Sequence, residues 1–284
     1  MSFLLYTANF KRIPFTGRMI QSKLEKRAAE IAKLTKNITD PDISIVIRSR
    51  NNSTYVKQWF EDIKAQEYSG QIEIIVVDTE STDDTISYAK SQGATIIQLS
   101  QADFTYPAAL NLGFNAAQYD YVVTLVGHSN LSNTMMFKSL AYWCLQDNFG
   151  GLYGIPLANK NGSIWERLSS TLSFFILRPQ VLRRSSGGML GANASVVKRS
   201  VWEKLGRYDE SYAGGGEDAA LARSMRAAGF NIVREPLWSL FHSHGLNFVD
   251  SLKQRWHWIQ VGRTKPQAFV TQRVHGRRPD LRND

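Results

Sequence analysis

Apolar residues along this chain follow two alternating periods. Four short runs rich in β-branched residues predict buried strands, at Ile43–Ile47, Ile72–Val77, Thr95–Ile97 and Tyr121–Val126. Between the first two runs, apolar residues recur at helical spacing at Val56, Trp59, Phe60 and Ile63. Capping residues or a helix-starting proline mark helix N-termini at Asn51–Thr54, at Ser81–Asp84, and at Pro107 for a helix reaching about Ala117. Strands that alternate with helices in this way predict βαβ units, hence an α/β fold with a mostly parallel sheet flanked by helices.

Polar residues follow three of the predicted strands, in the segments Arg48–Asn52, Asp78–Ser81 and Gly127–Asn130. Because ligands of parallel α/β sheets bind beyond the carboxyl ends of the strands, we expect the functional site at this edge. The dinucleotide-binding glycine fingerprint does not follow the first strand. This argues against a nicotinamide-dependent enzyme.

A further helix start carries candidate chemistry. Gly214-Gly215-Gly216 precedes Glu217 and Asp218, and we expect a helix with Leu221, Met225 and Ala228 on one face and Gly229 as its left-handed C-cap. The free N–H groups and the dipole of a helix N-terminus favour negative charge. An ionised carboxylate pair at a rigid helix tip, behind a glycine hinge, is placed as a general base would be. An ordinary preference for acidic residues at helix starts would produce the same pattern, so both interpretations remain open.

Size and composition describe a globular protein. A chain of 284 residues with 43% hydrophobic residues can form one large α/β domain or two small ones around a substantial core. No run approaches the roughly 20 apolar residues of a membrane-spanning helix, and no signal-peptide pattern opens the chain. The single cysteine, Cys144, excludes an internal disulfide and is typical of a reducing compartment. We therefore expect a cytoplasmic location.

The net charge of +9 is concentrated at the two ends of the chain. Residues 1–36 hold eight Lys or Arg against two Glu, and residues 251–284 hold eight against two Asp, so each end carries +6. The remaining residues, 37–250, carry 9 − 12 = −3. A nucleic-acid enzyme would more often show a basic stripe across its working face, so we expect no nucleic-acid partner. Basic ends favour peripheral association with an anionic membrane, at its inner face, or with an acidic partner; solvated tails without a partner are the alternative.

Several segments, taken in order, carry a family resemblance. They are Ser44–Asn52, Ile75–Thr85, Tyr106–Gly113, Gly127-His128 after the fourth strand, Gly191–Asn193 and Glu217-Asp218. Together they resemble an inverting family 2 glycosyltransferase, over roughly residues 42–245. The resemblance implies a GT-A fold with a Rossmann-like sheet. It also implies transfer of a sugar from a nucleotide-diphosphate sugar to a glycan or lipid-linked saccharide, as in polysaccharide biosynthesis.

The resemblance assigns roles residue by residue. Donor binding falls to Arg48, Ser49, Asn52, Asp78, Asn111, Gly127 and His128. Ser49 and Asn52 would line the base and ribose, and Asp78 would accept from the base N–H. Taken without the resemblance, Asp78 could equally cap a helix, and Asn111 could be a polar position on an exposed helix face.

The catalytic base implied by the resemblance is Asp218, with Glu217 orienting the acceptor or supporting the helix start. Gly191, Ala192, Asn193 and Gly216 would lie beside the transferred sugar and the acceptor. Two other functions stay open. One is a nucleotide-sugar hydrolase or nucleotidyltransferase, and the other is a binding module that has lost catalysis.

The chain departs from the family where Asp-x-Asp usually holds a divalent cation, because Val126-Gly127-His128 stands there. The polypeptide N-acetylgalactosaminyltransferases, which are relatives of the family, carry Asp-x-His at this place and a further histidine later. We expect His128 with His244, and His242 in reserve, to hold a divalent cation or to touch the diphosphate directly. Imidazole suits Mn²⁺ better than Mg²⁺, so the expected ion is Mn²⁺. A structural role for His128 is the alternative.

The segments expected are a basic helical extension over residues 1–40, a GT-A domain over 41–250 and a basic helix and tail over 251–284. A helix over Ser22–Thr35 would lie on lipid or pack on the domain, and an amphipathic helix is expected over Ser251–Arg263. Residues 157–190 have the least periodic pattern; we expect an acceptor-side loop, or an insertion packed on the core. The Gln-x-x-Arg-Trp spacing of processive synthases is absent, which favours transfer of a single sugar.

Overall fold

The computed structural model describes residues 16–159, 162–176, 179–182, 190–191, 193–212 and 215–261. Within these ranges the strands form an eight-stranded sheet in the order β3-β2-β1-β4-β9-β6-β10-β8. Their bounds are β1 Ile43–Ser49, β2 Ile72–Asp78, β3 Thr95–Gln98, β4 Tyr121–Val126, β6 Phe149–Tyr153, β8 Gln180–Leu182, β9 Ala194–Lys198 and β10 Asn231–Arg234. The four strands predicted from sequence are β1 to β4, and the parallel pairing expected of them is confirmed.

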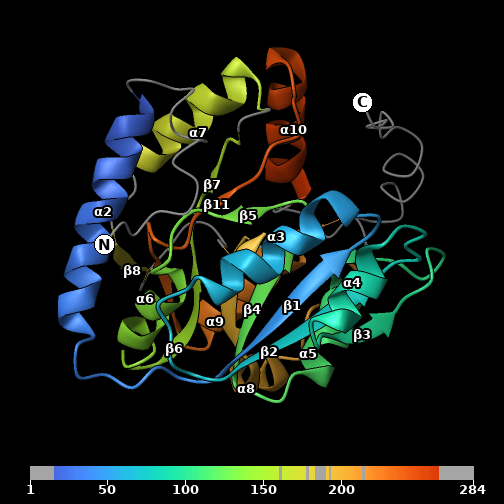
Figure 1. Ribbon diagram of the computed structural model, residues 1–284, viewed down its shortest axis with the longest axis horizontal. Coiled ribbons are helices and arrows are strands. Elements are labelled where there is room, and N and C mark those ends of the chain that lie inside the picture. The colour runs from blue at the N-terminus through green and yellow to red at the C-terminus, as the bar shows by residue number, and fades with distance from the viewer. Residues whose placement is uncertain are drawn as a thin grey trace.

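Helices cover both faces of the sheet (Figure 1). One face carries α3 Ser53–Lys64, α4 Thr85–Ser91 and α6 Met136–Trp143, and the other carries α5 Tyr106–Ala116, α8 Arg199–Lys204 and α9 Glu217–Ala227. The predicted helical face of α3 is confirmed, because Val56, Trp59, Phe60 and Ile63 are all buried. The alternation of strands and helices therefore produces the three-layered α/β architecture that the sequence predicted.

Strand β9 runs antiparallel between β4 and β6, so β4, β6 and β10 point the same way as β1. The carboxyl ends of these strands consequently meet at one edge of the sheet. A small second sheet lies beyond this edge, with strand order β5-β11-β7. Its strands are β5 Asn130–Leu131, β7 Pro156–Leu157 and β11 Leu240–Phe241.

Three further helices stand outside the two layers: α2 Thr16–Leu34, α7 Ile164–Ile176 and α10 Phe248–Val261. Helix α2 begins earlier than predicted, and it packs on the domain, because Leu24, Ala28 and Ile31 are at most 1% exposed. They contact a separate core that includes Phe174. The sequence left two positions open for this helix, on lipid or packed on the domain, and the structure shows it packed on the domain.

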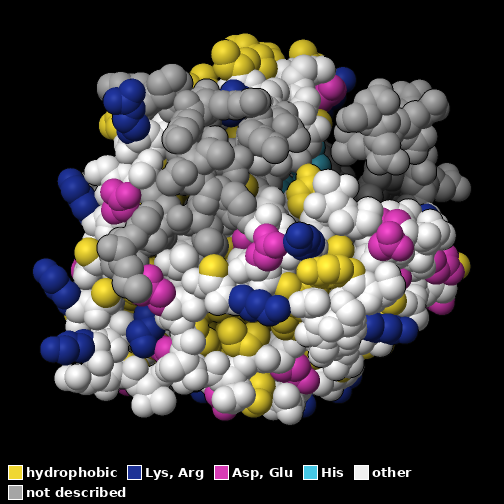
Figure 2. Space-filling view, in the orientation of Figure 1, with side chains coloured by type: hydrophobic (Ala, Val, Ile, Leu, Met, Phe, Trp, Pro, Cys, Tyr) yellow, Lys and Arg dark blue, Asp and Glu magenta, His cyan; other side chains and the backbone are white. Residues whose placement is uncertain are grey.

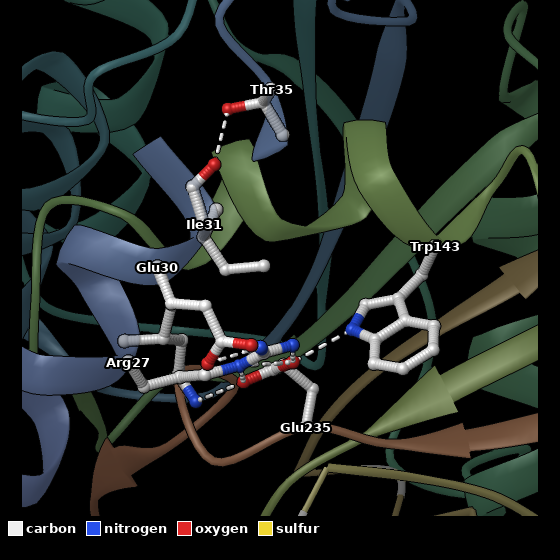
Figure 3. Close-up of polar contacts among 7 residues, drawn as sticks. Arg27, Glu30, Ile31, Thr35, Trp143 and Glu235 are labelled. Atoms are coloured by element: carbon white, nitrogen blue, oxygen red, sulfur yellow. Dashed lines mark hydrogen bonds and ion pairs between the residues drawn. The ribbon is translucent and has the colours of Figure 1, made fainter. Parts of the chain in front are cut away.

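A buried ion pair holds α2 in place (Figure 3). Arg27 Nη2 donates to Glu235 Oε2 at 2.6 Å, and the Trp143 indole N–H donates to the same oxygen at 2.6 Å. Glu235 follows β10 and is fully buried. The pair thus connects the N-terminal helix to the segment that leads into β11.

The prediction of a loop over residues 157–190 was wrong for α7. Ser163 and Glu166 form a capping box, since Glu166 N–H donates to Ser163 Oγ at 3.1 Å and Ser163 N–H donates to Glu166 Oε2 at 2.9 Å. Phe174 is fully buried on the inner side of the helix. The capping box and the packing of Phe174 support this helix. The predicted C-terminal helix is confirmed as α10, which starts three residues early because Asn247 Oδ1 accepts from Asp250 N–H.

Candidate active site

The polar ends of β1, β2 and β4 lie side by side. Ser49 pairs with Asp78 across the parallel ladder, and Arg48 pairs with Val126. Gly127 N–H also donates to the Arg48 carbonyl at 2.9 Å, which extends the ladder past the end of β4. The predicted site edge is therefore present, and it brings Arg48, Ser49, Asp78 and Gly127 together.

Asn52 holds the first segment of this edge together and lies close to Gly127 of the third. Its Nδ2 donates to Ser49 Oγ and to the Arg50 carbonyl, each at 3.0 Å. A Cβ on Gly127 would stand 2.7 Å from Asn52 Nδ2 and 3.0 Å from the Arg48 carbonyl oxygen. The Trp59 indole N–H donates to the Gly127 carbonyl at 2.8 Å. A side chain at 127 would therefore displace the Asn52 amide, and the hydrogen bonds of Asn52 and Trp59 hold this corner together.

Asp78 is fully buried at the end of β2. Its Oδ2 accepts from the Ser81 N–H at 2.9 Å, and its Oδ1 accepts from the Ser81 hydroxyl at 2.5 Å. These bonds fix the turn after β2. A carboxylate oxygen has a second lone pair, so these contacts leave acceptor capacity for the predicted base contact.

Arg48 points to the other side of the sheet, because side chains alternate along a strand. Its guanidinium lies over the Tyr106 ring, with Cζ 5.1 Å from the ring centroid. It also interacts electrostatically with Glu217. Arg48 thus joins the strand ends to the tip of α9.

The start of α9 has the positive φ angles predicted for its glycines, while their action as a hinge stays a prediction. Gly215 and Gly216 have φ angles of 115° and 95°, and the helix begins at Glu217. Gly229 has φ 85°, as expected of the C-cap. Leu221 and Met225 are buried as predicted, but Ala228 is exposed because it ends the helix; Ala222 takes its place on the buried face. Gly214 lies outside the described residues.

The two carboxylates at this tip have different environments. Glu217 is 4% exposed, and burial, with the nearby Asp218 charge, raises its pKa from 4.5 to about 8 although Arg48 opposes the shift. Asp218 is half-buried and accepts from the Ala219 N–H at 2.6 Å. Burial raises the pKa of Tyr208 well above its usual value, and the two carboxylates add to this shift. At neutral pH, Glu217 therefore holds a proton beside the more accessible Asp218.

Three histidines meet beyond the end of β4. The ligand nitrogens of His128, His242 and His244 all lie within 4.8 Å of one another. His242 Nε2 is 2.9 Å from His244 Nε2, and burial lowers the pKa of His242 to about 3, with the other two histidines adding to the shift. Neutral imidazole is the form that binds metal. The predicted reserve residue, His242, is thus a full member of the cluster, and its Nδ1 is buried without a hydrogen-bond partner.

Residues predicted to face the sugar lie near the same edge. Ala194 pairs with Leu125 across the β4–β9 ladder, which places Asn193 and Gly191 beside the carboxyl end of β4. Gly216 is the N-cap of α9. Ala192 lies outside the described residues.

Residues 44–206, more than half of the chain, match the model of glycosyl transferase family 2. The chain belongs to glycosyl transferase family 2. It is a glycosyltransferase, as the order of its motifs predicted. No curated protein sequence matches it significantly.

Solved structures of glycosyltransferases share its GT-A fold. The mannosyltransferase PcManGT from Pyrobaculum calidifontis, solved with GDP-Man and Mn²⁺, is 15% identical, with a TM-score of 0.57 over 90% of this chain and 76% of that one. Glucosyl-3-phosphoglycerate synthase from Mycobacterium tuberculosis, with Mn²⁺, UDP and phosphoglyceric acid, is 18% identical, with a TM-score of 0.54 over 85% and 84%. S. aureus TarS 1-349 is 14% identical, with a TM-score of 0.53 over 71% and 60%. At such identities the likeness shows the fold.

Asn111 of this glycosyltransferase has structural partners. Its Nδ2 donates to the Tyr208 carbonyl at 3.0 Å and to Glu210 Oε1 at 2.9 Å, and its Oδ1 accepts from the Tyr208 N–H. It is 7% exposed, so the alternative of an exposed polar position was wrong. Its amide positions Tyr208 beside the α9 carboxylates, while its contact with the donor stays a prediction.

Sequence reasoning missed Glu166 of the glycosyltransferase. Its carboxylate accepts from the backbone N–H groups of His244 and Gly245, at 2.9 and 3.1 Å. It therefore holds the backbone of one cluster histidine while it also caps α7. The Ser163-x-x-Glu166 spacing was visible in the sequence, but its contact with His244 was not.

Proposed function

We propose that this glycosyltransferase transfers a single sugar, with inversion, from a nucleotide-diphosphate sugar to a glycan or lipid-linked saccharide. The observation that carries the proposal is the connection of two features at one edge of the sheet. The corner of Ser49, Asn52 and Gly127 suits a nucleotide, and Arg48 links it to the carboxylates at the tip of α9.

Asp218 is the proposed general base. It is half-buried and therefore reachable, whereas Glu217 is buried and protonated at neutral pH. The acceptor hydroxyl would pass its proton to Asp218 as its oxygen attacks the anomeric carbon. The bond from that carbon to the diphosphate breaks on the opposite face, and the nucleoside diphosphate leaves with the electron pair. General-base help of this kind contributes ~10²–10⁴ in rate.

Glu217 has a separate proposed role. As a protonated acid, Glu217 can donate a hydrogen bond. Because it is then neutral, it does not place a second negative charge next to Asp218. It would thereby orient the acceptor or the Asp218 carboxylate. Arg48 supplies fixed positive charge beside both.

The histidine cluster fits a divalent cation. Three convergent imidazole nitrogens, one of them on a ring kept neutral by burial, leave open positions for oxygens of a diphosphate. A nitrogen-only set suits Mn²⁺ or Zn²⁺ better than Mg²⁺, and we propose Mn²⁺. When bound, the ion would neutralise charge on the departing diphosphate. His128, His242 and His244 would hold it, with Glu166 fixing the His244 backbone.

The proposal is tested by Asp218→Asn, with Asp147→Asn as the matched control. Asp147 is exposed and precedes β6, at the opposite edge of the sheet. With a donor identified by binding, Asp218→Asn should lower transfer at least 100-fold, by the ~10²–10⁴ of general-base catalysis. Donor binding should stay within about twofold, and the control should keep full activity.

Product analysis separates this function from its alternatives. Glycosylated acceptor supports the proposal. Free sugar or pyrophosphate as the sole product would contradict it. Equal turnover by Asp218→Asn and wild type would remove Asp218 as the base.

A further inference from the structure

Two neighbouring helices carry most of the exposed apolar side chains of the described chain. They are Ile164, Trp165, Leu168 and Leu172 of α7, and Phe248, Val249, Leu252 and Trp256 of α10, and we call these eight residues the α7–α10 surface. Each is between 43% and 74% exposed. In both helices they recur at i, i+1, i+4 and i+8, which is a single helical face.

The two helical faces form one surface. The rings of Trp165 and Phe248 lie 4.8 Å apart, so the rows meet where the helices touch. Figure 2 shows hydrophobic side chains gathered at the end of the molecule where Figure 1 places α7 and α10, with basic and acidic side chains beside them. The opposite side of α7 is already used by the core, where Phe174 is fully buried. The outward row is therefore a second apolar face.

Apolar surface of this extent requires an occupant. Contiguous apolar patches on soluble proteins mark interfaces with proteins or membranes. Helices with Trp, Phe and Leu on one side and charged residues on the other are typical of segments that lie in the membrane interface. No described helix has the length and hydrophobicity to cross a bilayer.

The distribution of charge selects the occupant. Helix α2 lies against α7, where Lys23 Nζ donates to the Phe174 carbonyl at 2.9 Å, and Arg18 is exposed in the first turn of α2. Lys253 of α10 is 74% exposed, with its Nζ 3.8 Å from Asp250 Oδ1. Beyond α10, residues 262–284 carry six Lys or Arg against two Asp in the sequence. Described basic side chains thus lie near the apolar surface, and the sequence that follows α10 adds a net charge of 6 − 2 = +4.

A second copy of the chain fits this surface poorly. A two-fold pairing places the same residues of both copies together. It would also bring together two chains that each carry a net charge of +9. An anionic bilayer has negatively charged headgroups above apolar acyl chains. It therefore complements an apolar surface that has basic side chains nearby.

We propose that the α7–α10 surface rests on an anionic lipid bilayer, with its aromatic and leucine side chains at the boundary between headgroups and acyl chains. The site lies close by, because Glu166 follows Trp165 in α7 and holds the backbone of His244. Histidine side chains are visible below this end in Figure 2. Resting on the proposed function, this orientation would present the site to a lipid-linked acceptor in the same membrane.

The test is co-sedimentation of the full chain with vesicles, without donor, acceptor or metal. Wild type should bind vesicles of phosphatidylcholine with 30 mol% phosphatidylglycerol, and should bind pure phosphatidylcholine at least tenfold more weakly. Each basic residue near an anionic surface strengthens binding roughly fivefold, and raising NaCl should weaken it. A triple variant, Leu168→Gln/Leu172→Gln/Leu252→Gln, should lose at least tenfold in binding.

Leu145→Gln is the matched control. Leu145 is 63% exposed and lies outside the surface, so its variant should bind as wild type does. Circular dichroism checks that the triple variant is folded. Equal binding by the triple variant and wild type, or no binding by wild type, would overturn the proposal. So would a wild-type dimer in light scattering that becomes monomeric in the triple variant, because a second copy would then occupy the surface. Failure here leaves the Asp218 test untouched, since vesicle binding requires no chemistry.

Discussion

Two adjacent carboxylates at one helix tip lie in different environments because their burial differs. Glu217 is 4% exposed, so desolvation favours its protonated form, whereas Asp218 is half-buried. Enzymes often separate an acid from a base by placing like groups in unlike surroundings. At the scale of the residue, this difference in burial supports the proposal that Asp218 is the base.

The raised pKa of Glu217 predicts a pH dependence of stability. The folded state keeps a proton up to a pKa of about 8, whereas the unfolded state releases it above about 4.5. The free energy of unfolding should therefore fall as pH rises through this window, by up to about 1.4 kcal/mol per pH unit from this one group. In urea titrations from pH 6.5 to 8, above the range in which the lowered pKa of His242 gives the opposite slope, Glu217→Gln should remove that fall. Glu61→Gln, at a side chain 52% exposed, should leave it; a wild-type slope retained in Glu217→Gln would refute the assignment.

The histidine cluster predicts loss of metal binding on single substitution. His128→Ala removes one of three convergent nitrogens, and Mn²⁺ affinity measured by calorimetry on metal-free protein should fall at least tenfold. His275→Ala, the same change in the C-terminal segment, serves as control. Unchanged Mn²⁺ affinity in His128→Ala would retire the ligand role of this residue.

At the scale of the element, α2 depends on one buried ion pair. Arg27 is 7% exposed and Glu235 is fully buried, so neither charge is screened by water. The pair joins α2 to the segment after β10 that leads to β11 and the histidines. The same ion pair therefore holds α2 and the segment that leads to His242.

Breaking that pair should be costly. Arg27→Met keeps the length of the side chain but leaves the Glu235 carboxylate buried without its cation, which typically costs about 3–5 kcal/mol. Lys26→Met, at an exposed position of the same helix, should change stability by less than about 0.5 kcal/mol. Urea unfolding measures both. A cost below about 1 kcal/mol for Arg27→Met would show that α2 is held by its apolar face alone.

At the scale of the whole molecule, the donor should stabilise the fold as one cooperative unit. A ligand at 100 times its Kd adds about 2.7 kcal/mol, which raises the Tm of a chain of this size by roughly 5 °C. A thermal-shift screen of nucleotide sugars with and without Mn²⁺ should find one such donor, with the larger shift in the presence of Mn²⁺. Equal Tm shifts with and without Mn²⁺ would show that donor binding does not depend on a metal ion at the histidine cluster.

Local features of this protein were predictable from the sequence because they depend on neighbouring residues. The β-branched runs of β1 to β4, the glycines before Glu217 and the C-cap at Gly229 each impose a backbone conformation within a few positions. The polar strand ends were likewise visible, since parallel strands present them at a common edge. Helix α7 was missed although Ser163 and Glu166 carry its capping box. The sequence does not show which residues pack against Phe174, so the buried face of this helix could not be recognised from it.

Tertiary structure alone decided the properties that depend on distant partners. Arg27 and Glu235 are 208 positions apart, and His128 meets His242 only because β5 and β11 pair beyond the sheet. The proposed division of roles between Glu217 and Asp218 rests on which of them the fold buries. Sequence determines where the chain turns and which way each face points; contacts between remote segments set burial, and burial sets the charge and chemistry of each side chain.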